Sequence, residues 1–318
     1  MKRQAYRLIA SRLGLALLTL LIVSALVFAM TGLLPGDAAQ EALGQAATPE
    51  AVAALRHQFG LDQPALHRYL VWLAHVVRGD FGMSLSNSLP VSELIRTRLP
   101  NSLMLAGLTT VVSVPIALAI GIFSAMFRGS WIDRALNIVT LSTVAVPEFL
   151  VATVAVLIFA VNLHWLPALS YLSSVSSFSD IVRIYAMPVM TLCCVLVAQM
   201  ARMTRAAVLD QLNSGYVEMA YLKGASQVRV VWRHVLPNAI GPIANAVALS
   251  LSYLFGGVVI VESIFNYPGL ASLMVDAVTN RDMPLVQGCV MVFCAAYLAL
   301  VLMADLCQIL SNPRLRQR

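Results

Sequence analysis

Six long hydrophobic segments alternate with polar stretches along the chain. They cover residues 13–34, 100–127, 136–163, 186–212, 239–260 and 285–310. Each reaches the roughly 20 residues that an α-helix needs to cross the apolar core of a bilayer. The second segment contains Pro115, which a membrane span tolerates when its neighbours satisfy the freed carbonyl, and the third contains Pro147 and Glu148. The pattern predicts an all-α integral membrane protein with six transmembrane helices.

The polar stretch between the first two segments, residues 35–98, is long enough to hold structure of its own. Thr48, Pro49 and Glu50 have the residue types of a helix start, and Gly60 is suited to ending that helix. Residues 64–78 predict a second helix, and residues 90–99 a third helix at the membrane surface. We therefore expect a small helical insert outside the cytoplasm.

The pattern also predicts a domain organisation. Residues 1–34 contain a basic N-terminus and the first span, and residues 35–98 form the insert. Residues 99–310 hold the remaining five spans, with residues 262–284 as an outer loop, and residues 311–318 form a basic tail.

The distribution of positive charge predicts the topology. With both termini in the cytoplasm, 14 of the 21 Lys and Arg residues fall on the inner side, and five of the other seven lie on the long insert. Short inner loops of membrane proteins carry an excess of Lys and Arg. We expect a multi-pass protein of the bacterial inner membrane, with Arg202 and Arg205 near the inner end of the fourth span.

Composition supports the membrane class. The chain is 59% apolar and 11% charged, whereas soluble domains carry about 25% charge. The net charge of +6 is explained by topology, so it does not indicate nucleic-acid binding. The five cysteines all fall in apolar segments, which indicates packing residues.

Candidate catalytic chemistry is sparse. The ionisable residues at or near membrane depth are Glu148, Glu262, Asp305 and His164, and they form no recognised catalytic motif.

The histidines of the insert lack metal-ligand spacing, so we predict no metal site. Neither of the two lysines lies in a phosphate-binding loop, so ATP would have to be bound by another subunit. We expect no enzyme activity on this chain, with Asp305 paired to an arginine and Glu148 and Glu262 as candidates for a pathway or gate.

Residues 213–238 form the longest polar interruption in the second half of the chain. Gly224 and Pro237 divide it, which predicts a short helix on each side of Gly224 and a stop at Pro237. Such a loop can dock into a soluble partner while the flanking segments stay in lipid. Apolar anchors for docking include Tyr216, and polar contacts include Lys223.

This loop resembles the EAA loop of the permease subunits of binding-protein-dependent ABC importers. The matching positions are Glu218, Ala220, Gly224, Leu236 and Pro237. The family usually has alanine where this chain has Met219.

The resemblance extends over nearly the whole chain and is closest to the dipeptide, oligopeptide and nickel permeases. The matching motifs are PGD (35–37), GLDQP (60–64), RYL (68–70), GDFGMS (79–84), ARMTRAAVLDQL (201–212), VESIFNYPGL (261–270), RDMPLVQG (281–288) and NPRLR (312–316). The chain departs from the family at Met104, where a carboxylate is usual, and at Ala271, where glycine is frequent.

The resemblance implies a type I ABC importer permease fold and a function. The chain would form half of a pathway that carries short peptides by alternating access. A second permease, two ATPases that bind ATP and Mg²⁺, and an extracytoplasmic solute-binding protein would be its partners, with no cofactor on this chain. The alternatives are the same machinery importing nickel or metal–chelator complexes, and an ATP-independent channel or carrier.

Overall fold

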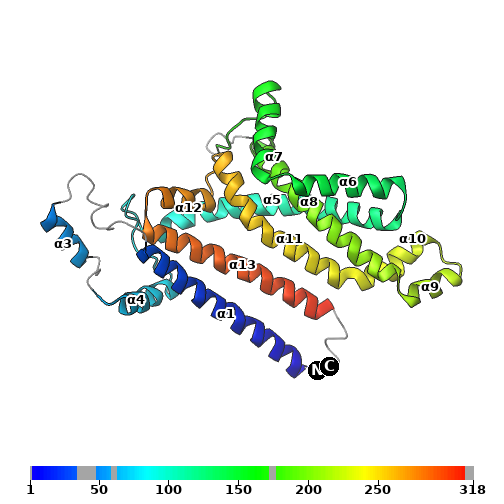
Figure 1. Ribbon diagram of the computed structural model, residues 1–318, viewed down its shortest axis with the longest axis horizontal. Helices are drawn as coiled ribbons and strands as arrows, with labels where there is room; N and C mark the ends of the chain where they lie inside the picture. The colour runs from blue at the N-terminus through cyan, green and yellow to red at the C-terminus, as the bar shows by residue number, and fades with distance from the viewer. Residues whose placement is uncertain (1, 34–47, 59–62, 172–176, 312–318) are drawn as a thin grey trace. The chain divides into compact units, whose positions relative to one another are not determined.

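The chain folds into α-helices with short π-helical stretches (Figure 1). The computed structural model describes residues 2–33, 48–58, 63–171 and 177–311. Its elements are α1 (Lys2–Leu33), α3 (Pro49–Gln58), α4 (Ala65–Val77), α5 (Val91–Met126), α6 (Trp131–Ala145), α7 (Glu148–Ala155), η2 (Val156–Asn162), α8 (Phe178–Leu212), α9 (Gly215–Leu222), α10 (Gln227–Val230), η4 (Val231–Val235), α11 (Leu236–Ile264), α12 (Leu270–Thr279) and α13 (Met283–Ser311). The expected all-α class is confirmed. The predicted PGD and NPRLR motifs and the predicted helix end at Gly60 lie outside the described residues.

Five helices are long and apolar enough to cross a membrane. They are Ile9–Thr31, Val91–Met126, Phe178–Leu212, Gln227–Ile264 and Met283–Met303. A sixth span results if α6 and the α7–η2 helix count as one, and these two are bent by 97°. Five continuous helices and one bent pair therefore correspond to the six predicted segments.

The break in the third segment differs from the uninterrupted span that we expect from sequence. Val146 is extended, with φ −88° and ψ 125°, and α7 begins directly after Pro147. A proline disfavours helical geometry in the residue before it and donates no hydrogen bond of its own. The helix therefore ends at Ala145 and restarts in another direction.

Two other predicted boundaries are wrong. Residues 90–99 are not a separate surface helix, because they are the first turns of α5, which continues through Pro100 and Pro115. The expected outer loop at residues 262–284 contains the last turn of α11 and the whole of α12. Apolar residues on α12 find a core to pack against, so this stretch is helical although it is too short to span a bilayer.

The chain divides into two compact units. Unit 1 comprises residues 1–13, 103–267 and 297–318, and unit 2 comprises residues 14–102 and 268–296. The four-segment organisation expected from sequence stays a prediction.

Helix α8 is the centre of unit 1, and α6, α7 and α11 pack against it. The approach of α5 to α8 is close: a Cβ added to Gly121 would lie 2.6 Å from the carbonyl oxygen of Ala201. Ala117, Met200 and Ala201 form a buried cluster at the same contact. Small residues let membrane helices approach and gain packing contacts that lipid cannot replace.

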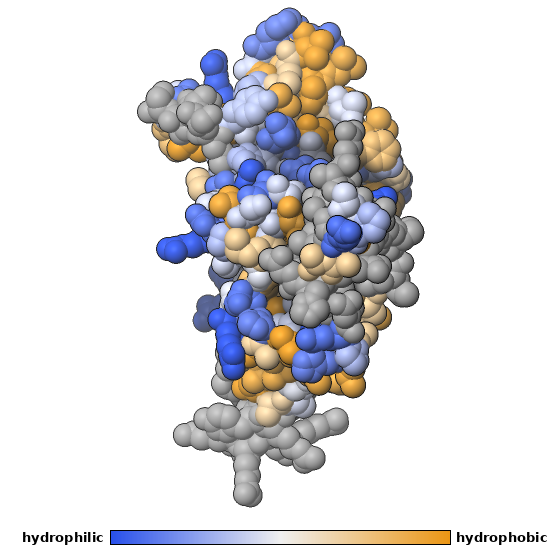
Figure 2. Space-filling view, turned by 90° about the vertical axis from the view of Figure 1, so that its left-hand side faces the viewer, coloured by the Kyte–Doolittle hydropathy of each residue, from blue (hydrophilic) through white to orange (hydrophobic). Residues whose placement is uncertain are grey.

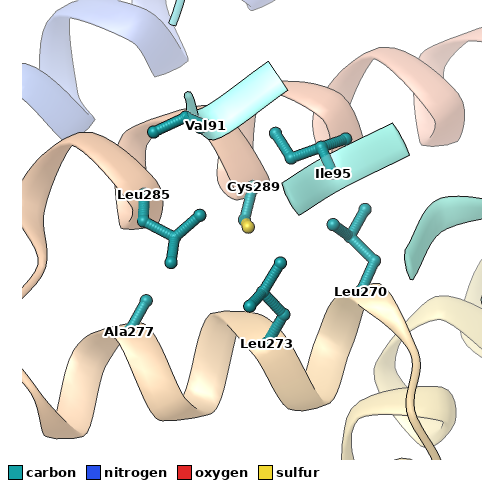
Figure 3. Close-up of a cluster of buried hydrophobic side chains, with 7 residues drawn as sticks. All are labelled: Val91, Ile95, Leu270, Leu273, Ala277, Leu285 and Cys289. Atoms are coloured by element: carbon teal, nitrogen blue, oxygen red, sulfur yellow. The ribbon is translucent and has the colours of Figure 1, made fainter. Parts of the chain in front are cut away.

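Unit 2 is built around a small apolar core that α5, α12 and α13 share (Figure 3). Val91 and Ile95 of α5 lie in one buried cluster with Leu270 and Leu273 of α12, and Cys289 of α13 lies between them. Asn101 donates a hydrogen bond to the carbonyl of Pro268, and the amide of Leu270 donates one to Ser102. These contacts hold the short helix α12 on the first turns of α5.

A buried carboxylate joins two distant turns of unit 2. Asp282 is fully buried and accepts hydrogen bonds from the hydroxyls of Ser84 and Ser86 and from the amide of Leu285. It thereby caps α13 and ties the turn before α5 to it. Burial raises the pKa of Asp282, but the serine hydroxyls and the backbone amides of Leu85 and Ser86 outweigh it, so that the pKa lies below its ordinary value.

We predict that Asp282→Asn destabilises the protein in a pH-dependent way. A carboxyl whose pKa is lowered on folding contributes stability above its unfolded pKa of about 3.9, and this contribution is lost as the pH falls through the folded pKa. The difference in thermal unfolding between wild type and Asp282→Asn in detergent should therefore be constant above about pH 5 and shrink below about pH 4. Asp276→Asn, a change at an exposed position of α12, is the control and should leave stability nearly unchanged. Equal behaviour of the two variants would contradict the account.

Candidate functional site

The residues predicted for docking lie on α9 and around it, at the C-terminal end of α8 (Figure 1). Asn213 and Ser214 separate the two helices, and the hydroxyl of Tyr216 donates a hydrogen bond to Gln211 of α8. The expected helices before and after Gly224 are both present, as α9 and α10.

Gly224 ends α9 in a way that favours glycine. Its φ is +79°, in the left-handed region that side chains disfavour. Its amide donates to the carbonyl of Tyr221 at 2.9 Å, and the amide of Ala225 donates to the carbonyl of Ala220 at 3.1 Å. This pair of bonds defines a Schellman cap, which satisfies carbonyls that the helix end would leave without partners. The cap fixes the direction in which the chain leaves α9.

One face of α9 is anchored to unit 1. Val217 and Ala220 are buried against Ala125 of α5, Val208 of α8, and Val230 and Val235. Leu236 is packed against the same cluster. Three helices therefore support α9 from behind: α5, α8 and the continuous helix made of α10, η4 and α11. The short helix is held by tertiary packing because its eight residues are too few for stability alone.

The other face of α9 is open and apolar. Tyr216, Met219, Tyr221 and Leu222 are exposed, and Leu222 is 76% accessible. Glu218 and Lys223 are exposed beside them. Apolar side chains held outward on a rigid support are a feature of protein–protein contact sites.

Pro237 does not stop the helix as we expect from sequence. It lies in the first turn of α11, directly after the π-helical stretch η4. A π-helical adjustment lets the carbonyls near a proline find other donors, so that the helix continues. The side chain of Asn238 also donates to the carbonyl of His234, at 2.7 Å.

A buried ion pair braces the helices that support α9. Arg205 of α8 binds Asp133 of α6 with two hydrogen bonds, Nε to Oδ1 and Nη2 to Oδ2, both 2.9 Å long. Ser124 of α5 donates to Asp133 at 2.6 Å and accepts from Arg205 at 3.0 Å. Asn137 and the amide of Gly129 donate to the same carboxylate. Asp133 is thus fully partnered, as a buried charge must be.

The turn after α5 connects this brace to the α9 loop. Arg128 donates to Asn213 at 3.4 Å, at the start of the loop, and Gln227 donates to the carbonyl of Met126 beyond Gly224. The loop is therefore held at both ends by the turn that leads into Asp133.

Sequence reasoning misses this brace. Arg205 is counted there only as one of the positive charges near the inner end of a span. Ser130 caps α6, because the amide of Asp133 donates a hydrogen bond to its hydroxyl. Nothing in one sequence pairs Asp133 with a residue on another helix.

The two candidate pathway residues lie elsewhere in unit 1. Glu148 is the first residue of α7, and its carboxylate lies against Gly257 of α11, where a Cβ would be 2.7 Å from Oε2. Glu262 is fully buried near the end of α11. The expected pairing of Asp305 is confirmed, with Arg12 at 3.2 Å. In the described parts of the chain, no group of three His, Cys, Asp or Glu residues could hold a metal ion.

Five helices long and apolar enough to span a membrane and one bent pair, with the short helix α9 displayed on a braced support, are the structure of a multi-span membrane protein. The family described as "Binding-protein-dependent transport system inner membrane component" matches residues 117–317, and its N-terminal companion family matches residues 5–106. The chain belongs to this family, and it is therefore an ABC importer permease component, which carries no catalytic site of its own, in the inner membrane.

Curated relatives match over nearly their full length. The chain is 33% identical to the probable peptide ABC transporter permease protein y4tP of Sinorhizobium fredii, covering 97% of this chain and 98% of that one. It is 35% identical to the glutathione transport system permease protein GsiC of Escherichia coli K12, covering 94% and 95%.

A solved structure supports the fold. The inward-facing MetNI methionine ABC transporter matches with a TM-score of 0.50 and 17% identity, covering 70% of this chain and 95% of that one. At this identity the match concerns the fold alone, which is that of a type I importer permease.

We predict that Arg205→Gln strongly destabilises unit 1, because it leaves the Asp133 carboxylate buried without its cation. Removing one partner of a buried ion pair costs about 3–5 kcal/mol of unfolding free energy. Arg202→Gln, one turn away on α8 at a partly buried position, is the matched control. Thermal unfolding of the purified variants checks this, and equal stability of the two variants would show that the brace is not needed.

Proposed function

We propose that α9 is the element through which this permease is driven by partner ATPases during import of short peptides. The observation that carries the proposal is the pairing of an exposed apolar face with a rigid support on the same eight-residue helix. A helix that only covered the core would bury its apolar residues. A helix that only linked two spans would need no brace.

The direction of force transfer follows from the contacts. A partner that pushes α9 acts directly on Val208 of α8 and Ala125 of α5, because Val217 and Ala220 pack on them. The Arg205–Asp133 pair connects α8 to α6, and Ser124 of α5 is hydrogen-bonded to both residues. Movement of α9 would thus shift α5, α6 and α8 together, which is what alternating access by rocking of helices requires.

The membrane orientation is part of the proposal. We place both termini and α9 in the cytoplasm, where ATP is available. The excess of Lys and Arg on the predicted inner segments supports this orientation. So does the Arg12–Asp305 pair, because it brings the beginning of α1 and the end of α13 to the same side.

The cargo and the partners are proposed from the relatives. One is named for peptides and another for glutathione, itself a short peptide, so we assign short peptides as the cargo class over nickel or metal chelates. One chain provides half of a pathway. The assembly would add a second permease, two ATPases holding ATP and Mg²⁺, and a solute-binding protein, with no cofactor on this chain.

Glu148 and Glu262 are the residues that we propose for the pathway or its gate. A carboxylate within a membrane protein is costly unless it is paired or functional. Glu148 lies at the break between α6 and α7, and Gly257 leaves room for it. This is a place where a helix can move without losing an internal hydrogen bond.

We predict that Met219→Glu prevents ATPase binding without unfolding the permease. Met219 is exposed on α9, so a charge there is tolerated in water but would be desolvated in an apolar contact. Co-purification of the ATPase with the tagged permease in mild detergent measures this. Phe178→Glu is the control, since it adds the same charge at an exposed apolar position at the other end of α8. Retention of the ATPase by Met219→Glu would refute the docking site.

We predict that Gly224→Leu uncouples ATP hydrolysis from uptake, whereas Gly224→Asn retains coupling. No atom lies within 4 Å of a Cβ at Gly224, so a Cβ there meets no neighbour, and the strain that it introduces comes from the positive φ. Such a conformation costs roughly 1–2 kcal/mol for an ordinary residue, and asparagine tolerates it better. ATP hydrolysis and peptide uptake in the same proteoliposomes check this. Normal uptake by a well-expressed Gly224→Leu variant would contradict the role of the cap.

A further inference from the structure

Helix α4 of unit 2 is fastened to α1 by a polar contact and an aromatic cluster. The hydroxyls of Ser24 and Tyr69 share a hydrogen bond of 2.8 Å. The Phe28 ring lies 5.5 Å from the Tyr69 ring and 5.8 Å from the Trp72 ring. Among the described side chains of α1, which begin at Ile9, only Ser24 is buried. The contact with α4 is therefore a main point at which α1 is covered by protein.

The position of Ser24 along α1 indicates the depth of α4. The uncharged part of α1 is Leu13–Leu33, and its midpoint is Val23, next to Ser24. The apolar core of a bilayer extends about 15 Å from its midplane. When this uncharged part is centred in the bilayer, the Tyr69 hydroxyl that contacts Ser24 lies at hydrocarbon depth, so α4 does not lie wholly above the membrane surface.

The exposure of the apolar residues on α4 agrees with a position in the membrane. Tyr69, Trp72 and Val76 are on the side toward α1 and are partly buried. A second apolar stripe, Leu66, Leu70 and Val77, is exposed, and Val77 is 80% accessible. These three positions follow the i, i+4, i+11 spacing of one helix face.

Most side chains on the remaining face of α4 are polar. His67, His75 and Arg78 are exposed there beside Val71, and His75 is hydrogen-bonded to Asp80 at 2.9 Å. Arg68 lies over the ring of Phe28 with its guanidinium carbon 5.7 Å from the ring centroid. Figure 2 shows the side of the molecule that carries α3 and α4 in Figure 1. Hydrophobic and hydrophilic residues lie next to one another on that side.

We infer that α4 is an interfacial membrane helix that lies in the bilayer leaflet holding the C-terminal end of α1. The stripe of Leu66, Leu70 and Val77 contacts phospholipid acyl chains. The face of His67, His75 and Arg78 contacts headgroups and water. A helix with one apolar and one polar face, with aromatic residues at its edge, is suited to this boundary.

The lipid-anchored position has a consequence for unit 2. Asp80 follows α4 and accepts hydrogen bonds from His75 and from the amide of Gly82. Ser84, two residues beyond Gly82, is bound to Asp282 at the start of α13. The membrane contact of α4 therefore fixes the depth, relative to the membrane, of the turn that is bound to Asp282 at the start of α13. The inference depends on α1 crossing the membrane and does not depend on the cargo or on the action of α9.

The test is the accessibility of nitroxide labels in the assembled transporter, reconstituted in phosphatidylethanolamine–phosphatidylglycerol vesicles. Leu70→Cys carries the label in a background whose five native cysteines are replaced by serine or alanine. His75→Cys, about 140° around the same helix from Leu70, is the matched control. Leu26→Cys is the lipid reference, since Leu26 is exposed on α1 two residues from Ser24. Each variant is first shown to retain ATP-dependent uptake.

The expected result is that the Leu70 label, like the Leu26 label, collides several-fold more often with oxygen than with a water-soluble nickel chelate. The His75 label should show the reverse preference. Val77→Cys repeats the measurement if Leu70→Cys does not assemble. Access of the chelate to both faces of α4 would place the helix in water and overturn the inference. Shielding of Leu70 from both reagents would show that a protein partner covers the stripe and would overturn it equally.

Discussion

A buried charge in a membrane protein must be paired, and the arrangement of unit 1 depends on how this requirement is met. Asp133 receives Arg205, Ser124, Asn137 and a backbone amide, so that one carboxylate ties together α5, α6 and α8. A leucine in its place would pack as well, but it would leave the three helices free to slide. In the function that we propose, the ion pair makes them move as a body, and α9 rests on that body. A push on this one short helix would then move several long helices.

Unit 2 also contains a buried carboxylate, Asp282, whose hydrogen-bonding requirement is met by neighbouring groups. Asp282 caps α13 and holds the turn at Ser84 and Ser86, while the apolar cluster around Cys289 fills the space between α5, α12 and α13. Both carboxylates lie next to a helix terminus and both are partnered by serine hydroxyls. Each thereby fixes a turn that would otherwise be determined only by the nonspecific packing of apolar side chains.

Much of the fold is readable from the sequence because the membrane imposes a simple rule on hydrophobic length. The long apolar segments, the helix before Gly224 and the helix after it are present as expected. Glycine suits position 224 because the Schellman cap needs a positive φ there. A glycine within a sequence motif can signal a positive φ directly. Prolines are harder to interpret. Pro100, Pro115 and Pro237 are accommodated within helices, whereas Pro147 breaks one, and the difference lies in packing that a single sequence does not reveal.

The tertiary partners are the part that sequence reasoning could not supply. Ser84 and Asp282 each lie in a motif that supports the family resemblance, yet nothing along the chain shows that they touch. Asp133 and Arg205 are likewise 72 positions apart and on different helices. The exposed apolar face of α9 is different, because Tyr216 is recognisable in advance as a docking anchor. What the structure adds is the opposite, buried face that supports it.

The most direct test of the account is affinity purification of the chain from its native membranes in mild detergent, followed by uptake measurements in liposomes. We expect an ATPase, a second permease and a solute-binding protein to accompany it, and peptide uptake to require ATP hydrolysis. Recovery of the chain alone, with solute uptake that proceeds without ATP, would contradict the central claim.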